Sequence, residues 1–174
     1  MTALGPRPRP SAQVKIRRAL MANLEMWQRL LSALNVRSAR ARTLSPVVPC
    51  ECASDASLTG YGWYGMGSFV YGKWPDDWSG RLGRVLSSDP VEVAAMRRIY
   101  ICECELWAVL FMVRSLAPRC SDCVLKIRVD NEPVVHMINR FSTRSEACLP
   151  ILQELCWWCA VYAVQLDCTW IDTK

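Results

Sequence analysis

Residues 124–133 read VLKIRVDNEP, and this stretch decides the fold. Apolar residues at 125, 127 and 129 alternate with charged residues at 126, 128 and 130, which is the period of a β-strand with one buried face. The Asn131-Glu132-Pro133 triplet has the form of an N-cap followed by an early-turn proline, so we predict a short helix through about residue 139. Asp130 therefore closes a strand directly before a helix.

The chain after this stretch repeats the pattern of a helix followed by a strand. Thr143 or Ser145 can cap a second helix that reaches about Ala163. Residues 165–171 alternate again and are predicted to form the last strand. Strands separated by helices in this way are typical of parallel crossover connections.

The chain before this stretch predicts antiparallel strands. From Pro49 the period is two, which indicates a strand over 50–56, a turn over 57–60 and two further strands over 61–66 and 68–74. Residues 75–98 are rich in Gly, Ser, Asp, Pro and Arg and are interpreted as an irregular connection. Residues 103–116 form a nearly unbroken apolar run that predicts a helix packed on most sides and ended by Pro118.

The N-terminal region differs in character from the rest. Ser11 can cap an amphipathic helix that runs to about Asn35, and residues 37–46 indicate a polar, basic linker. We therefore expect residues 1–46 to be a basic arm with an amphipathic connection helix, and residues 47–174 to be the main domain. The predicted fold class is α/β, with a mixed five-stranded sheet in the order β-β-β-α-β-α-β behind an N-terminal helical extension.

Charge and hydropathy restrict the partners. Residues 1–49 hold nine Lys or Arg and one acid, whereas residues 50–174 hold twelve basic and fifteen acidic residues. A basic arm favours nucleic acid or an anionic membrane face, an acidic domain suits cations, and an ordinary solvated surface is the alternative. No apolar stretch approaches the roughly 18 to 20 residues that cross a bilayer. The N-terminus lacks the apolar segment of a secretory signal, so no membrane partner and an intracellular location, cytoplasmic or nuclear, are expected.

Ten cysteines raise the question of zinc. Two pairs have the spacing C-x-x-C, at Cys120/Cys123 and Cys156/Cys159. The second pair lies in an apolar stretch that indicates a helix, whereas zinc-ribbon pairs usually occupy tight polar turns. We therefore expect most of these cysteines to be small buried hydrophobic residues, while a zinc-binding module stays an alternative.

Three acids are candidates for chemistry. Asp55 ends the first predicted strand, Asp130 ends a later one, and Glu105 begins the most apolar run, where an unpaired charge is costly. Singly, each has an ordinary structural role, in a turn, in a first helical turn or beside a cap. Together they would repel one another unless a cation is bound, and oxygen ligands favour Mg²⁺ or Mn²⁺. Two such ions about 4 Å apart would suit phosphodiester hydrolysis.

The same residues carry a resemblance to a known family. Residues 54–57 (SDAS) followed by 60–62 (GYG), residues 105–108 (ELWA) and residues 128–131 (RVDN) resemble the first-strand, first-helix and fourth-strand motifs of ribonuclease H, in the same order. The match covers most of residues 50–171 and is similar to the domains in reverse transcriptases of DIRS-like retrotransposons. Residues 19–35 resemble the helix that joins polymerase and ribonuclease domains there.

The resemblance implies a function and a site. It implies cleavage of the RNA strand of an RNA/DNA hybrid by two divalent ions, with Asp55, Glu105 and Asp130 as ligands, next to a polymerase domain of a longer polyprotein. The family adds a fourth acid on a final helix, and the 47–174 domain is expected to lack that helix. Asp172 aligns with the preceding loop, and Trp170 stands where a His is common in the family.

Two alternatives to this nuclease stay open besides zinc binding. A catalytically silent ribonuclease H-like remnant that lacks the fourth carboxylate would bind nucleic acid through its basic arm. Integrases and transposases share the architecture and would act on DNA.

The single histidine, His136, is expected to be a packing or surface residue. Core packing, rather than base stacking, is the expected role of the tryptophans at 63, 74, 78, 157 and 158.

Overall fold

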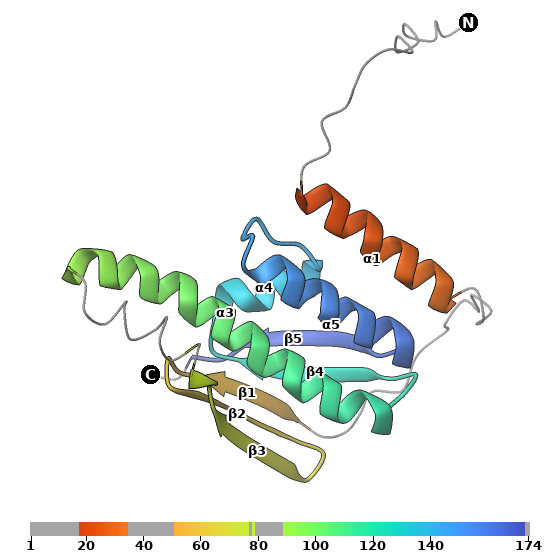
Figure 1. The fold of residues 1–174 in the computed structure, drawn as a ribbon. Coiled ribbons are helices and arrows are strands. Elements are labelled where there is room, and N and C mark those ends of the chain that lie inside the picture. Colours follow the sequence, from red (N-terminus) through yellow and green to blue (C-terminus); the bar gives the residue numbers. More distant parts are fainter. Residues whose placement is uncertain (1–17, 35–50, 77, 79–88, 173–174) are drawn as a thin grey trace, which may run out of the picture.

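The computed structural model describes residues 18–34, 51–76, 78 and 89–172. Helix α1 precedes three strands, and the later strands alternate with helices (Figure 1). The bounds are α1 Arg18–Leu34, β1 Cys52–Ala56, β2 Gly60–Gly65, β3 Ser68–Lys73, α3 Pro90–Leu116, the short 3-10 helix η1 Ala117–Arg119, β4 Val124–Val129, α4 Glu132–Arg140, α5 Cys148–Tyr162 and β5 Gln165–Trp170.

The five strands form one mixed sheet in the order β3-β2-β1-β4-β5. Strand β1 pairs antiparallel with β2, and β2 pairs antiparallel with β3. Strand β4 lies parallel to both β1 and β5. The predicted class, α/β with a mixed five-stranded sheet in this element order, is confirmed.

A tight turn joins β2 to β3. Met66 and Gly67 both have positive φ, at 51° and 73°. Two-residue hairpin turns with positive φ at both positions follow the right-handed twist of the strands they connect. The turn therefore sets the register that places Tyr64 opposite Phe69.

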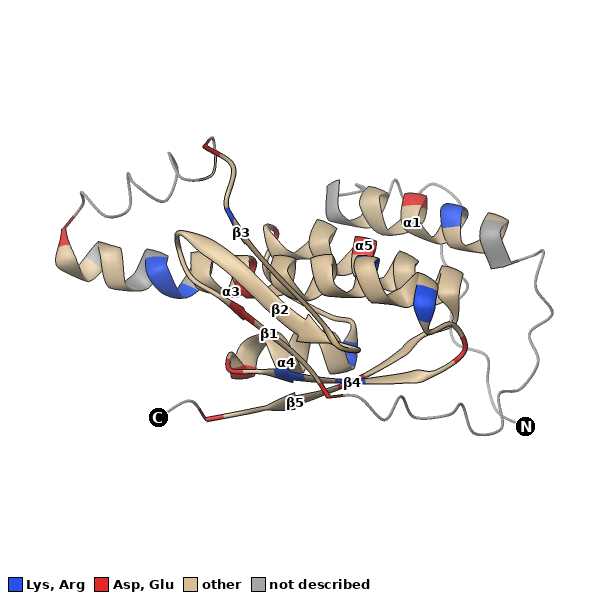
Figure 2. Ribbon diagram, turned by 90° about the horizontal axis from the view of Figure 1, so that it is seen from below, with Lys and Arg blue, Asp and Glu red and all other residues tan. Residues whose placement is uncertain are grey.

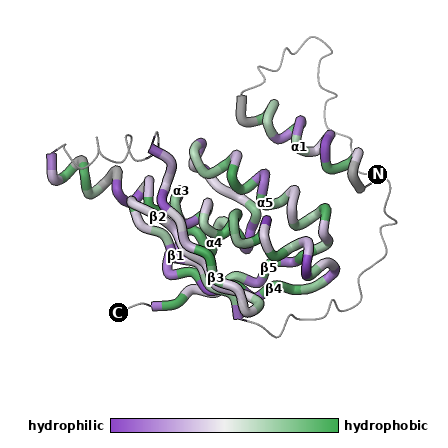
Figure 3. The backbone as a smooth tube through the Cα atoms, turned by 60° about the horizontal axis from the view of Figure 1, so that its bottom comes forward, coloured by the Kyte–Doolittle hydropathy of each residue, from purple (hydrophilic) through white to green (hydrophobic). Residues whose placement is uncertain are grey.

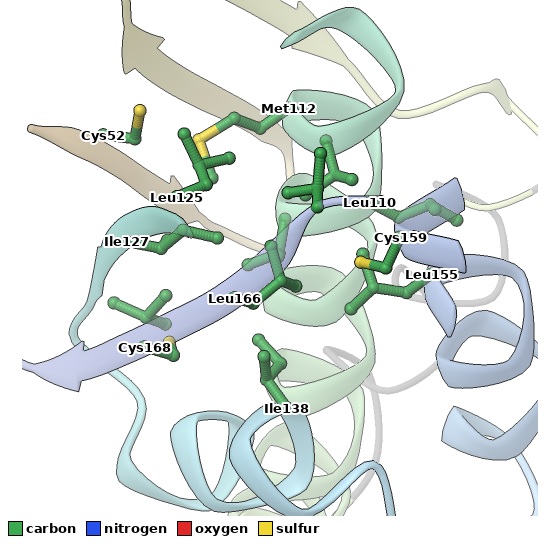
Figure 4. Close-up of a cluster of buried hydrophobic side chains, with 14 of the residues drawn as sticks. Cys52, Leu110, Met112, Leu125, Ile127, Ile138, Leu155, Cys159, Leu166 and Cys168 are labelled. Atoms are coloured by element: carbon green, nitrogen blue, oxygen red, sulfur yellow. The ribbon is translucent and has the colours of Figure 1, made fainter. Parts of the chain in front are cut away.

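Helices α3, α4 and α5 cover one face of the sheet. In Figure 2 the strands lie in front of these helices, and no described helix covers the face toward the viewer. The inner faces of the strands and the apolar faces of the three helices form one buried cluster, part of which is drawn in Figure 4. Leu110 of α3, Leu125 of β4 and Leu155 of α5 are 0% exposed in this cluster. Hydrophobic colouring runs through this layer, whereas α1 mixes hydrophobic and hydrophilic residues (Figure 3).

Helix α3 is longer than the sequence pattern predicts. It begins at Pro90, with the side chain of Asp89 accepting a hydrogen bond from the Val91 N–H at 2.9 Å. The prediction of an irregular connection is therefore wrong for residues 90–98, while residues 79–88 lie outside the described part. The first turns of α3 extend past the sheet (Figure 1), and Val91, Ala94 and Arg97 there are exposed.

Helix α5 begins later than predicted. Its first residue is Cys148, and the Cys148 N–H donates to Ser145 Oγ at 3.3 Å. The predicted N-cap of α4 is confirmed, because Asn131 Oδ1 accepts from the Val134 N–H at 3.2 Å.

Helix α1 packs on α5. Gln153 Nε2 donates to Asn23 Oδ1 at 2.8 Å, and the Arg29 guanidinium lies 4.8 Å from the centre of the Trp157 ring. The predicted start of this helix at Ser11, the basic linker 37–46 and the domain boundary near residue 47 lie outside the described residues. None of the described helices is both long enough and apolar enough to cross a membrane.

Candidate metal centre

The sheet topology brings Asp55 and Asp130 together. Strands β1 and β4 are parallel neighbours, with Ser54 opposite Val129. Each acid follows directly after these paired residues, so both carboxyl groups lie at the same edge of the sheet. This edge, at the carboxyl ends of parallel strands, is where ligands bind in open α/β sheets.

Helix α3 supplies the third acid. It crosses the inner face of the sheet next to β1, and Glu105 Oε1 accepts a hydrogen bond from the Ala56 N–H at 3.1 Å. Ligand oxygens of Asp55, Glu105 and Asp130 all lie within 4.8 Å of one another. Among the described residues this is the one group of three or more acidic, His or Cys side chains that meets so closely. We call it the acid triad.

Glu105 is buried in the middle of α3. It is 2% exposed, and its Oε2 has no hydrogen-bond partner. The expectation of a first-turn position is wrong, because the helix begins at Pro90. Burial, and then the negative charge of Asp130, raises the pKa of Glu105 to about 8.

The two aspartates occupy the open side of the triad. Asp55 is exposed, and Asp130 is partly buried. Desolvation of the Asp55 carboxyl and the nearby charge of Asp130 raise the pKa of Asp55, while the Ala56 N–H acts against this. The raised pKa values of Asp55 and Glu105 reflect burial first and repulsion by Asp130 second, and a bound cation would oppose both effects.

Neighbouring side chains hold Asp130 in place. The Trp170 indole N–H of β5 donates to the Asp130 carbonyl at 3.1 Å. Next to it, Asn131 Oδ1 accepts from the Val134 N–H and from Cys102 Sγ at 3.6 Å. Sequence reasoning missed Trp170 and Cys102 in this role, because only the fold places β5 and α3 beside the end of β4.

The three oxygen-bearing side chains fit a hard divalent cation. They supply carboxylate oxygens, which Mg²⁺ and Mn²⁺ prefer, and the orphaned Glu105 Oε2 is a buried acceptor that lacks a donor. A metal ion is therefore a physically sound partner for the triad.

The other candidate residues lie elsewhere. His136 is exposed on α4, with Nε2 3.7 Å from Glu132 Oε1, as expected of a surface residue. Asp172 is exposed after β5. Trp63 and Trp74 are buried, at 6% and 4% exposed, as expected of core residues.

The described cysteines are free thiols, and most of them pack in the core. Burial raises the pKa of Cys120 and of Cys159 to about 12, so both are protonated at neutral pH. Cys156 and Cys159 lie on α5, as the apolar pattern predicts. No cysteine joins a ligand group of three or more within the described residues.

Fold and site together define a mixed α/β domain with a carboxylate triad that could bind a metal ion at the edge of its sheet. Comparisons with known protein families, with curated proteins and with solved structures find no match.

Proposed function

We propose that this chain is a ribonuclease H-like endonuclease that cleaves the RNA strand of RNA/DNA hybrids. We further propose that Asp55, Glu105 and Asp130 hold Mg²⁺ or Mn²⁺, and that the domain acts beside the polymerase domain of a retroelement reverse transcriptase. The observation that carries the proposal is the meeting of three carboxyl groups from distant parts of the chain within 4.8 Å.

The chemistry of the triad supports hydrolysis of a phosphodiester. Asp55, Glu105 and Asp130 would hold the divalent ions, which would supply activation of a water molecule and stabilisation of the leaving oxygen of the phosphodiester. Glu105 anchors the buried side of the site through the Ala56 N–H, which leaves Oε2 free to serve as a ligand. Asp55 and Asp130 lie at the open side, where a strand of nucleic acid can approach.

The order of the motifs supports the hybrid as substrate. The SDAS, ELWA and RVDN segments, which resemble ribonuclease H motifs, contribute one acid each to the triad. A metal site made by chance from surface acids would not require one acid from each of three such segments.

A cleavage assay tests this proposal. A hybrid with end-labelled RNA is incubated with the protein and Mg²⁺, and the products are separated on a denaturing gel. We expect shortened RNA with the wild-type chain, none with Asp130→Asn and none with EDTA. Glu146→Gln, at an exposed acid before α5, is the matched control and should cleave normally. Equal cleavage by wild type and Asp130→Asn would contradict the proposal.

A second candidate is a catalytically silent ribonuclease H-like module. The acid triad contains three carboxylates, and among the described residues no fourth joins it. Such a module would bind the hybrid in a salt-sensitive way through its basic arm and leave the RNA intact. Binding without cleavage at any Mg²⁺ or Mn²⁺ concentration would favour it.

A further inference from the structure

The hairpin of β2 and β3 exposes three aromatic rings. Phe69 and Tyr71 are 73% and 81% exposed, and Tyr64 is 52% exposed. Tyr64 and Phe69 are direct cross-strand partners, and Tyr71 follows two residues after Phe69, so all three rings lie on one face. This is the sheet face that no described helix covers (Figure 2). We call these three side chains the aromatic platform.

The aromatic platform adjoins the acid triad. Asp55 of β1, Gly62 of β2 and Tyr71 of β3 form one row across the sheet, about 10 Å long for two strand spacings. Gly62 has no side chain, so the row is open between the acid and the ring. A pocket of about 290 Å³ occupies this region, and its lining includes Tyr64, Asp55 and Asp130.

One cationic side chain, Lys73, lies beside the rings, and the rest of this face carries charges of both signs. Lys73 shares the outward side of β3 with the two rings, and Lys126 and Arg128 point outward from β4. Lys73 forms no ion pair with another described residue, whereas Arg128 pairs with Glu51 and Lys126 stands opposite the exposed Asp167 of β5. Strands β2 and β3 contain no acid.

We propose that the aromatic platform stacks unpaired bases of a nucleic-acid strand whose backbone passes the acid triad. Phe69 and Tyr71 lie roughly 7 Å apart along the strand, which is about two base steps. Exposed rings beside cationic side chains are the usual surface for single strands, because every base has a face that stacks. Only the position of the scissile linkage at the triad rests on the proposed function; the binding does not.

Binding of a single strand tests the platform. A fluorescent RNA 12-mer without secondary structure is titrated in EDTA, and its anisotropy is followed. We expect Phe69→Ala and Tyr71→Ala each to weaken binding on the order of 5- to 100-fold. Tyr71→Phe keeps the ring and should bind as wild type does. Phe141→Ala removes a 41% exposed ring after α4 and serves as the matched control. Circular dichroism verifies that each variant folds.

A comparison of two hybrids links the platform to the acid triad. We expect the wild-type chain to bind a hybrid with an unpaired RNA flank more tightly than a blunt hybrid. The double variant Phe69→Ala, Tyr71→Ala should lose this gain in affinity. Its affinity for the blunt hybrid should equal that of the wild-type chain. If no hybrid is cleaved but the gain disappears in the double variant, the proposed function fails and the platform stands. Unchanged single-strand binding in the double variant would overturn the platform. The platform proposal would also be overturned if the double variant lost a self-association that the wild-type chain shows in sedimentation while its oligonucleotide binding stayed intact. The rings would then belong to a protein contact.

Discussion

Glu105 is the buried acid of the triad, so the free-energy cost of its ionisation is large. Its carboxyl group is buried in the apolar helix α3, beside Asp130, and its pKa is raised to about 8. The folded state therefore holds this proton more tightly than the unfolded chain, whose glutamates have pKa values near 4.5. The stabilisation that results is present below pH 4.5 and is lost as pH rises through about 8.

The loss of this stabilisation with rising pH leads to a prediction for the metal-free protein. We expect the free energy of unfolding, measured by urea denaturation in EDTA, to fall between pH 5 and pH 9 for the wild-type chain. Glu105→Gln keeps the neutral form at all pH values, so its stability should fall less over this range. Identical pH dependence of the two proteins would show that Glu105 ionises freely in the folded state.

Asn131 contributes both to the start of helix α4 and to the surroundings of Asp130. Its side chain caps α4 and accepts the Cys102 thiol, next to the triad residue Asp130. We predict that Asn131→Ala costs about 1 kcal/mol of stability, the usual loss for an N-cap. It should also slow hybrid cleavage, because Asp130 loses a fixed neighbour. Asn131→Ser restores a capping oxygen and should recover most of the stability; failure of serine to do so would show that capping is not the role of Asn131.

Helix α3 carries the largest share of the buried face among the helices. Leu106, Leu110 and Val113 are 0% exposed against the sheet and α5. We predict that Leu110→Ala lowers the free energy of unfolding by about 2–5 kcal/mol, the range for a leucine removed from a packed core. Val91→Ala, at a 78% exposed position of the same helix, should change stability by less than about 0.5 kcal/mol. Equal effects in urea denaturation would contradict the packing described.

The elements differ in how well their sequences predict them. Strand β4 was predictable because a single buried face imposes a period of two on Leu125, Ile127 and Val129. The start of α3 was not, because its first turns lie beyond the sheet and carry exposed residues such as Val91 and Arg97. Asp89 and Pro90, an N-cap and a first-turn proline, were the signal that could have marked it.

At the scale of the whole molecule, the acid triad was predictable and its surroundings were not. Three local sequence segments pointed to Asp55, Glu105 and Asp130 without any information on the distances between them. The strand order and helix α3 bring these three residues together in the fold. The aromatic platform depends on which side of the hairpin each ring faces and on the sheet face that the described helices leave uncovered, and no local pattern reveals either. Trp63 is buried while its neighbour Tyr64 is exposed, so aromatic content alone does not locate the platform.

The fold places the two proposed surfaces side by side. The triad lies at the edge of the sheet, and the aromatic platform lies on the open face next to it. A strand held on the platform would meet the triad without any movement of the covering helices. We therefore expect the two surfaces to be separable by mutation but to act on the same strand.

Binding of Mn²⁺, followed by electron paramagnetic resonance at pH 8.5, tests the central claim most directly. The claim is that the acid triad forms one divalent-cation site. We predict saturable binding by the wild-type chain and by Glu146→Gln, and affinity at least about tenfold weaker for Asp130→Asn and for Glu105→Gln, because each removes a charged ligand. Equal affinity of all four proteins for Mn²⁺ would contradict the account.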